Sequence, residues 1–323
     1  MVAILLLGAQ GQLGWELGAS LSALGKVLHF GRKEADLSRL DELRKLVLTI
    51  KPRVIINAAA HTKVDQAEDE PELAGLINAE APAMLASLAK ELDAWLVHYS
   101  TDYVFDGTKD GVYTEDDATA PLNVYGQSKL DGDKAIMASG CRHLIFRTSW
   151  VFGHHGRNFP RTILELARQE DHFSIVADQF GSPTGVELIS SVTALALNQA
   201  QRSDQNLSGL YNLVASGYVN WQEYAIYVVR RAIDLGWSLL ADPDKIIPRS
   251  TEESGRKAVR PANSRLSTEK LTRVFGLTPP PWQYYVDRVL WAWTREYVAA
   301  NPNPPKILGL KFIPPMNGAM SRS

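Results

Sequence analysis

Residues 2–14 read VAILLLGAQGQLG, an apolar run followed at once by glycines at positions 8, 11 and 14. A short apolar run that ends on a glycine is typical of a buried strand in a parallel sheet. Glycine at the turn lets backbone N–H groups approach a pyrophosphate at the start of the next helix, and the third glycine lets that helix pack closely on the sheet. The stretch therefore predicts a dinucleotide-binding loop, although glycines also end strands for structural reasons alone. The expected cofactor contacts in this loop are Gly8, Gln10, Gly11 and Gly14.

Short apolar runs continue to alternate with longer amphipathic segments as far as about residue 150. Unbroken apolar strands separated by helices indicate a parallel sheet that is covered on both faces. We therefore expect an α/β protein with a Rossmann-type doubly wound sheet, whose ligands bind beyond the carboxyl ends of the strands. The expected strands are residues 2–7, 26–30, 54–57, 95–100 and 143–148, and the expected helices are 12–23, 40–50, 71–92 and 124–138.

After residue 150 the loops lengthen and the pattern becomes less regular. This change predicts a smaller C-terminal α/β substrate domain over residues 151–300, set against residues 1–150, with the helix near 185–200 returning to the first domain. Helices are expected at 160–169 and 282–299, a strand at 173–178, and loop over 242–264. Asn220 and Glu223 have the spacing of a capping box, which would open a helix running to about residue 232. Residues 301–323 form a tail without a clear pattern.

Composition excludes several classes of protein. The chain has 323 residues and a formal net charge of −2, so no overall basic field recruits nucleic acid or an anionic membrane. Its one cysteine, Cys141, excludes an internal disulfide and any metal site built from several cysteines. No stretch approaches the roughly 20 apolar residues of a membrane span, and the apolar start lacks the features of a signal peptide. We expect a cytoplasmic protein.

The turn after the second expected strand bears on the choice of cofactor. The loop spacing is GxxGxxG, which resembles the short-chain dehydrogenase/reductase superfamily. An NAD site usually has an acid at the end of the second strand to hold the ribose 2′-OH. This chain has Gly31-Arg32-Lys33 there, and two cations suit a 2′-phosphate. The sequence thus favours NADPH, with NADH still accepted; the alternative is a solvated basic turn.

Residues 99–107, YSTDYVFDG, and 125–129, YGQSK, place hydroxyl, acid and amine groups at the same expected edge. Tyr125 and Lys129 are four residues apart, so a helix puts them on one face. Reduction of a carbonyl by hydride needs a proton donor, and we expect the Lys129 ammonium to lower the pKa of the Tyr125 phenol. Thr101 can hydrogen-bond the same substrate oxygen. A Tyr and Lys at this spacing are weak evidence alone; their place in a glycine-loop domain makes the combination strong.

Taken together, these motifs resemble the dTDP-4-dehydrorhamnose reductase family, extended short-chain dehydrogenases/reductases that complete dTDP-L-rhamnose synthesis. The segments that carry the resemblance span residues 1–295 and are GQLGWEL (11–17), VIINAAAHTKVDQAE (54–68), HYSTDYVFDG (98–107), PLNVYGQSKLDG (121–132), HLIFRTSW (143–150), DQFGSPTG (178–185) and RPANSRLST (260–268). The resemblance implies a nucleotide-sugar substrate and a catalytic triad of Thr101, Tyr125 and Lys129. It implies cofactor contacts at Gly11, Gln12, Leu13, Asp36, Leu37, Ala60, His61 and Thr62, and substrate contacts at Thr101, Asp102 and Trp150.

Several of these residues also have a structural explanation. His61 could cap the end of a strand, Asp102 could form a turn, and Trp150 could belong to the core. Arg260 precedes a proline in a loop, where it could be solvated or could bind a substrate diphosphate through its guanidinium group.

The chain departs from the family pattern at a metal site. The family is associated with a magnesium ion that glutamates hold at a dimer interface, and Glu16 and Glu187 match two of those positions. The third aligns with Ala292, and the nearest acid is Glu296, one turn further on. Two carboxylates are a small ligand set for a hard cation. The sequence therefore favours neither Mg²⁺ binding nor a homodimer that depends on it.

Two other functions use related motifs. Another sugar-nucleotide reductase, epimerase or dehydratase would share the fold, but dehydratases typically have Thr-Asp-Glu where this chain has Thr101-Asp102-Tyr103. The non-catalytic regulatory subunit of methionine adenosyltransferase shares the DYVFDG-type segment. That family does not keep the catalytic threonine, whereas all three members of the triad are present here.

Overall fold

A six-stranded parallel sheet forms the centre of the computed structural model, which describes residues 3–300, with the side chains of residues 3–296. The strand order is β10-β5-β4-β3-β1-β2, and every neighbouring pair is parallel. Strand order reverses at β1, because β2 lies on one side of it and β3 on the other. Such a reversal opens a crevice at the carboxyl ends of the strands. The strands are β1 (Ala3–Leu7), β2 (Lys26–Phe30), β3 (Val54–Asn57), β4 (Trp95–Thr101), β5 (Arg142–Thr148) and β10 (Gly209–Asn212).

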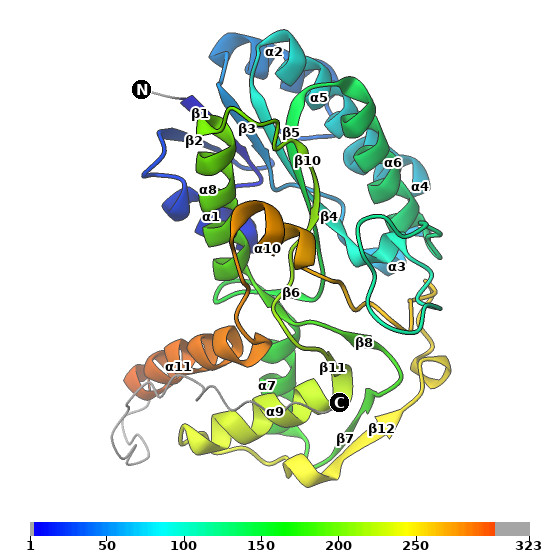
Figure 1. The fold of residues 1–323 in the computed structure, drawn as a ribbon. Helices are drawn as coiled ribbons and strands as arrows, with labels where there is room; N and C mark the ends of the chain where they lie inside the picture. Colours follow the sequence, from blue (N-terminus) through cyan, green and yellow to red (C-terminus); the bar gives the residue numbers. More distant parts are fainter. Residues whose placement is uncertain (1–2, 301–323) are drawn as a thin grey trace.

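Helices cover both faces of this sheet (Figure 1). Alternate residues of β1 face opposite sides, so Ile4 and Leu6 belong to one buried cluster and Leu5 and Leu7 to another. This explains why the strands are apolar without interruption. The first face carries α1 (Gln12–Ser20) and α8 (Val186–Arg202), which pack on each other, and the second carries α2 (Leu40–Ile50), α5 (Ala81–Glu91) and α6 (Val124–Ser139).

A smaller group of elements lies beyond the carboxyl ends of the strands, in the lower half of Figure 1. Its apolar side chains join the cluster on the α1 and α8 face. Its main elements are α7 (Phe159–Gln169), β7 (Phe173–Val176), α9 (Trp221–Asp234), β12 (Ile246–Arg249) and α11 (Trp282–Ala300). Helix α10 (Glu269–Phe275) lies higher in the view and contacts β10 of the main sheet. Four two-residue strands form two further pairs: β6 (Val151–Phe152) with β9 (Thr184–Gly185), and β8 (Phe180–Gly181) with β11 (Val219–Asn220). Short helical turns are α3 (Val64–Ala67), α4 (Pro71–Gly75), η1 (Leu76–Glu80), η2 (Asp102–Val104), η3 (Pro243–Lys245) and η4 (Glu252–Ser254).

Most predicted elements are present. The five expected strands are confirmed to within a residue at each end, except that Val2 lies outside the described residues. The capping box is confirmed, because the Asn220 side chain accepts from the Glu223 N–H and the Glu223 carboxylate accepts from the Asn220 N–H. The helix expected at 12–23 ends earlier, at Ser20. The tail 301–323 also lies outside the described residues.

One expectation about secondary structure was wrong, and one strand of the main sheet was missed. The helix expected over 71–92 is continuous from Pro71 to Glu91, with the π-helical turn η1 inside it, and polar contacts made by Asn78 hold that turn in place. The loop expected over 242–264 contains β12, which pairs in parallel with β7 at the edge of a two-stranded sheet. Proline is tolerated at such an edge, so Pro248 masked this strand. Strand β10 was not foreseen, and it adds residues beyond 150 to the main sheet; the division into domains stays a prediction.

Among the residues that the structure describes, no helix combines the length and the apolar character that crossing a membrane requires.

Gly14 gives a direct test of how closely α1 approaches the glycine loop. A Cβ at this position would overlap the carbonyl oxygen of Gly8, whereas a Cβ at Gly75 in α4 has no heavy atom within 4 Å. Gly14→Ala should therefore lower the free energy of unfolding by about 3 kcal/mol, because backbone must move to admit the methyl group. Gly75→Ala should raise it by about 0.5–1 kcal/mol. Urea unfolding of both variants measures the difference, and a Gly14→Ala protein as stable as the wild type would contradict the close approach.

Candidate active site

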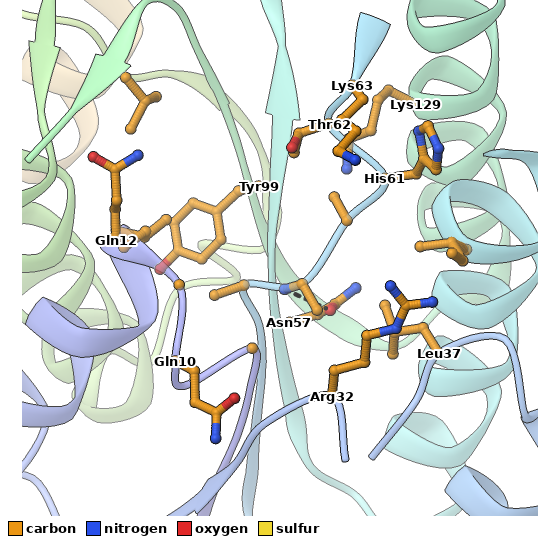
Figure 2. A pocket seen from close by; sticks show the side chains of 18 of the residues that line it. Gln10, Gln12, Arg32, Leu37, Asn57, His61, Thr62, Lys63, Tyr99 and Lys129 are labelled. Carbon is orange, nitrogen blue, oxygen red and sulfur yellow. Dashed lines mark hydrogen bonds between the residues drawn. The ribbon is translucent and has the colours of Figure 1, made fainter. Parts of the chain in front are cut away.

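A cleft of about 1020 Å³ lies at the carboxyl ends of β1, β3 and β4 (Figure 2). The glycine loop and helix α6 both contribute to its lining. Every predicted cofactor residue except Gly14 lines it: Gly8, Gln10, Gly11, Gln12, Leu13, Arg32, Asp36, Leu37, Ala60, His61, Thr62, Tyr125 and Lys129. The cleft thus brings together residues that lie more than 100 positions apart in the sequence.

The glycine loop forms a backbone cradle in this cleft. Gly8 has a φ of 76°, and a Cβ there would lie 2.7 Å from the Ala59 backbone nitrogen. The Gly11 N–H donates to the Gly8 carbonyl at 3.0 Å, so the turn is closed just before α1 begins. Only glycine suits Gly8, because its backbone is left-handed and the segment after β3 is in contact with it. This cradle at the start of a helix fits the pyrophosphate of a dinucleotide.

The turn after β2 carries an acid as well as the expected cations. Arg32 lines the cleft and is 77% exposed, and its Nε donates to Asp36 at 3.3 Å; Lys33 is not among the lining residues. Burial acts to raise the pKa of Asp36, but hydrogen bonds from the Ser38 N–H (2.9 Å) and hydroxyl (2.8 Å) and from Arg32 outweigh it and lower the pKa. Asp36, which the resemblance places in the cofactor site, thus pairs with Arg32 and offsets part of the positive charge of the turn.

The segment after β3 is held in place by the π-helical turn. The His61 N–H donates to Asn78 Oδ1 at 2.8 Å, and Asn78 Nδ2 donates to the His61 carbonyl at 3.0 Å. The same Nδ2 lies 3.0 Å from the Ser128 hydroxyl on α6. The ring of His61 faces Glu70, with Nε2 3.5 Å from Oε2. Asn78 therefore links the cofactor side of the cleft to the helix that carries Tyr125.

Helix α6 places Tyr125 and Lys129 on the wall of the cleft. Asn123 caps the helix by accepting from the Gly126 N–H at 2.8 Å, which fixes where the first turn begins. Lys129 is 1% exposed, and its Nζ lies 3.1 Å from Nε2 of His98. The two side chains that the sequence places one helical turn apart therefore face the same cavity, with Lys129 the more deeply buried.

The pKa of Tyr125 differs from the expectation. Burial raises it to about 12; a hydrogen bond to Thr101 opposes this rise, and the charges of Asp102 and Asp133 add to it. Burial also lowers the pKa of Lys129 to about 8, while Asp133 acts in the opposite direction. The expected net lowering of the Tyr125 pKa was therefore wrong for this structure, because desolvation of the phenolate outweighs the opposing effects.

Thr101 and Asp102 lie where β4 ends. The Thr101 hydroxyl donates to Asp102 Oδ1 at 3.0 Å and accepts from the Tyr103 N–H at 3.2 Å. Burial raises the pKa of Asp102 to about 6, against the opposing effect of the Ser264 and Thr101 hydroxyls. The preceding residue, Ser100, lines the cleft. The strand thus ends on two buried, hydrogen-bonded polar groups, and neither Thr101 nor Asp102 is among the residues that line the cleft.

Trp150 and Arg260 lie outside the lining of the cleft and have partners of their own. Trp150 has a φ of 46° and stacks on Trp221, with the ring centroids 3.5 Å apart. The Arg260 guanidinium donates to both carboxylate oxygens of Asp65, at 2.8 and 3.1 Å. That hydrogen bond, set against burial, lowers the pKa of Asp65 to about 2. Substrate binding by Trp150 and Arg260 stays a prediction.

A second cavity, of about 510 Å³, contains the residues that bear on metal binding. Glu16, Glu187 and Ala292 line it together with His154, His155, Arg288, Val289 and Trp291. Glu296 points to His154, at 2.8 Å from its Nε2. Burial and the charge of Glu16 raise the pKa of Glu187. Among the described residues no three His, Cys, Asp or Glu side chains are grouped to hold a metal, and two carboxylates beside Arg288 fit Mg²⁺ poorly.

Sequence reasoning missed three buried polar residues that support the cleft: Asn57, Asn78 and His98. His98 interrupts the apolar run of β4 and Asn57 is the polar last residue of β3, which are the signals that could have identified them. Asn78 gives no such signal, because the π-helical turn that positions it has no recognisable pattern.

Comparison with known proteins shows similarity to dTDP-4-dehydrorhamnose reductases along nearly the whole chain. Residues 2–295 match the family model described as RmlD substrate binding domain. The chain is 45% identical over 291 residues to dTDP-4-dehydrorhamnose reductase of Escherichia coli, which covers 89% of this chain and 96% of the relative. It also resembles the crystal structure of the Bacillus anthracis dTDP-4-dehydrorhamnose reductase in complex with NADP, with a TM-score of 0.80 and 34% identity over 90% of this chain and 99% of that one. A Clostridium acetobutylicum dTDP-4-dehydrorhamnose reductase structure gives a TM-score of 0.83 at 31% identity, over 90% of this chain and 99% of that one.

The second cavity leads to a prediction about metal. A ligand that binds only the folded protein raises its melting temperature. Because Glu16 and Glu187 are too few ligands, adding millimolar Mg²⁺ or a chelator should leave the melting temperature and the mass in solution unchanged. Glu187→Gln is the matched control and should respond in the same way as the wild type. A Mg²⁺-dependent rise in melting temperature that Glu187→Gln abolishes would show that a site exists.

Proposed function

We propose that this chain, which belongs to the dTDP-4-dehydrorhamnose reductase family, reduces the C4 keto group of dTDP-4-dehydro-L-rhamnose to give dTDP-L-rhamnose, with NADPH as the preferred cofactor and NADH also accepted. Tyr125 and Lys129 line the same cleft as the glycine loop, and this juxtaposition carries the proposal. It places a proton donor and a buried amine beside a cradle suited to a dinucleotide. The family membership supplies the substrate, and its NADP-bound member supports the cofactor.

The residues at the end of β4 and on α6 supply the proton. Bound NADPH supplies the hydride to the carbonyl carbon. The Tyr125 hydroxyl donates its proton to the oxygen that becomes negative, and the Thr101 hydroxyl turns from Asp102 to donate to that oxygen. A pKa of about 12 keeps Tyr125 protonated at neutral pH, and a sugar alkoxide is a stronger base than a phenolate, so the transfer is favourable. With a pKa of about 8, Lys129 is mainly an ammonium at neutral pH and stabilises the phenolate left behind.

The substrate lies on the side of Tyr125 that faces the C-terminal elements. Asp102 and Trp150 contact the sugar nucleotide in this proposal, and Arg260 binds its diphosphate. Arg260 already donates to Asp65, which also accepts from the Ala258 N–H at 3.1 Å. Diphosphate binding therefore competes with an ion pair that links residues 258–260 to the segment after β3. Both reactants of this reaction are metabolites of the cytoplasm, where we expect the enzyme to act.

The reaction itself is tested by mixing the pure protein with NADPH and dTDP-4-dehydro-L-rhamnose. One reduced nicotinamide should be lost for each sugar converted, and Tyr125→Phe should lower kcat by roughly 100-fold or more while substrate still binds. Tyr99→Phe is the matched control, because Tyr99 also lines the cleft but its hydroxyl is bonded to Thr193 at 3.0 Å. Near wild-type kcat in Tyr125→Phe would show that Tyr125 is not the acid.

The choice of cofactor is tested at Arg32. Its Nε is engaged by Asp36, and its terminal nitrogens can make charge-assisted bonds to a 2′-phosphate. Solvent screening limits the preference to about 1–2 kcal/mol, roughly 5- to 30-fold in kcat/KM in favour of NADPH. Arg32→Ala should remove most of this preference by weakening NADPH, and Lys33→Ala should leave it unchanged. A wild-type preference for NADH, or an unchanged ratio in Arg32→Ala, would contradict the assignment.

A further inference from the structure

Three polar side chains form a buried row behind the cleft: Asn57 on β3, His98 on β4 and Lys129 on α6. Each of them is 1% exposed. The nitrogen Asn57 Nδ2 lies 3.2 Å from His98 Nδ1, and His98 Nε2 lies 3.1 Å from Lys129 Nζ. Asn57 and Lys129 both reach the lining of the cleft, near the middle and at the upper right of Figure 2. The row therefore connects the loop after β3 to the amine beside Tyr125.

Strand pairing fixes the first half of this row. Asn57 and His98 are direct partners in the parallel register of β3 and β4, so their side chains leave the sheet together. The Asn57 carbonyl oxygen Oδ1 accepts from the Ala59 N–H at 3.3 Å. This contact turns the amide nitrogen of Asn57 toward His98, and an amide nitrogen can only donate. His98 Nδ1 must then accept.

The direction of these bonds limits the state of Lys129. The pKa of His98 is well below its ordinary value because burial and the charge of Lys129 disfavour the imidazolium, so the ring is neutral. A neutral ring that accepts at Nδ1 carries its proton on Nε2 and donates it to Lys129 Nζ. Only a neutral amine can accept that bond. In this arrangement both hydrogen bonds of the row form only when Lys129 is unprotonated.

An ammonium at Lys129 requires the opposite direction. It can only donate, so His98 Nε2 must accept and the ring proton must move to Nδ1. Asn57 then has to present its oxygen to His98, which gives up the bond from Ala59. Two neutral forms of His98 thus correspond to two protonation states of Lys129. At a pKa of about 8 both states of Lys129 are accessible near neutral pH.

Other charges around Lys129 do not supply an alternative partner. Asp133 lies one turn further along α6, and its carboxylate accepts from the Ser100 hydroxyl at 2.7 Å and from Arg147 on β5 at 3.3 Å. Its charge acts on Lys129 to favour the ammonium, and Tyr125 is the remaining titratable group on the same helix face. Among the described residues, His98 is the group within hydrogen-bond distance of Lys129 Nζ.

We propose that His98, backed by Asn57, is a positioning residue for Lys129, and that the hydrogen bonds of the row reverse direction when Lys129 gains or loses its proton. His98 holds the amine against the wall of the cleft in both states. The ring stays neutral while its proton moves from one nitrogen to the other. The part of this proposal that concerns turnover rests on the proposed function, whereas the reversal of the row does not.

The reversal is measured in the wild-type protein by two-bond ¹H–¹⁵N correlation spectra of ¹⁵N-histidine protein over pH 6–10. The protein has seven histidines, and the spectrum of His98→Gln identifies the signal of His98. We expect its proton on Nδ1 below about pH 8 and on Nε2 above it. His143 is an internal control, because its Nδ1 faces the Cys141 carbonyl at 2.9 Å and should keep its proton throughout. A single form of His98 across this range, or a doubly protonated ring, would overturn the proposal.

Enzyme kinetics test the positioning role separately. His98→Leu removes the partner of Lys129 and should lower kcat/KM about tenfold or more, whereas His98→Gln keeps a polar group at that position and should recover most of the loss. Asn57→Asp can accept from both Ala59 and His98, so it favours the ammonium. In the wild type, kcat/KM should fall at alkaline pH as Lys129 loses its proton. In Asn57→Asp this fall should occur about one pH unit higher, so that kcat/KM above the wild-type midpoint is roughly tenfold larger than in the wild type. Unchanged kinetics in His98→Leu together with an unmoved profile in Asn57→Asp would contradict the positioning role.

These two measurements separate the proposals from each other. If His98 shows the reversal but the protein reduces no nucleotide sugar, the proposal about the row holds and the proposed function is contradicted. If the protein reduces the nucleotide sugar but His98 keeps one tautomer at every pH, the proposed function holds and the proposal about the row is contradicted.

Discussion

Helix α6 packs so closely on η2, directly after β4, and on the π-helical turn η1 that two of its residues have no room for a Cβ. A methyl group at Gly126 would overlap the Tyr103 carbonyl, and one at Gly132 would overlap the Asn78 carbonyl. This contact brings Tyr125 to the end of the strand that carries Thr101, and it brings Lys129 within reach of His98. The proposed catalytic groups therefore come from rigid elements whose spacing is fixed by backbone contact, which suits a site that must hold a proton donor in one place.

The same logic applies to the cofactor side of the cleft. Strand order reverses at β1, and the two loops that meet there are the glycine loop and the segment after β3. Gly8 allows these loops to touch, and Asn78 ties the second loop to α6. A change in how α6 packs would thus shift the glycine loop as well as Tyr125. The buried row of Asn57, His98 and Lys129 is a second link between the same two sides.

Much of this arrangement could be predicted from the sequence because it follows from local patterns. The apolar runs gave the strands of the main sheet up to residue 150, and the three glycines and the Tyr125–Lys129 spacing indicated the two sides of the cleft. What could not be predicted depends on contacts between distant residues. The pairing of Arg32 with Asp36, the burial that raises the pKa of Tyr125 and the contact of Lys129 with His98 all arise only once the chain has folded. Strands β10 and β12 were missed for the same reason, since their partners in the sheets define them.

The most direct test of the account follows the hydrogen that is transferred. NADPH labelled with deuterium at C4 of the nicotinamide, on the face that the enzyme uses, is incubated with the protein and dTDP-4-dehydro-L-rhamnose, and the sugar product is examined by NMR. The account predicts dTDP-L-rhamnose with deuterium at C4 of the sugar and a protium in its new hydroxyl group, exchangeable with water. Product with no deuterium at C4, or deuterium at another ring carbon, would contradict direct reduction of the C4 keto group in this cleft.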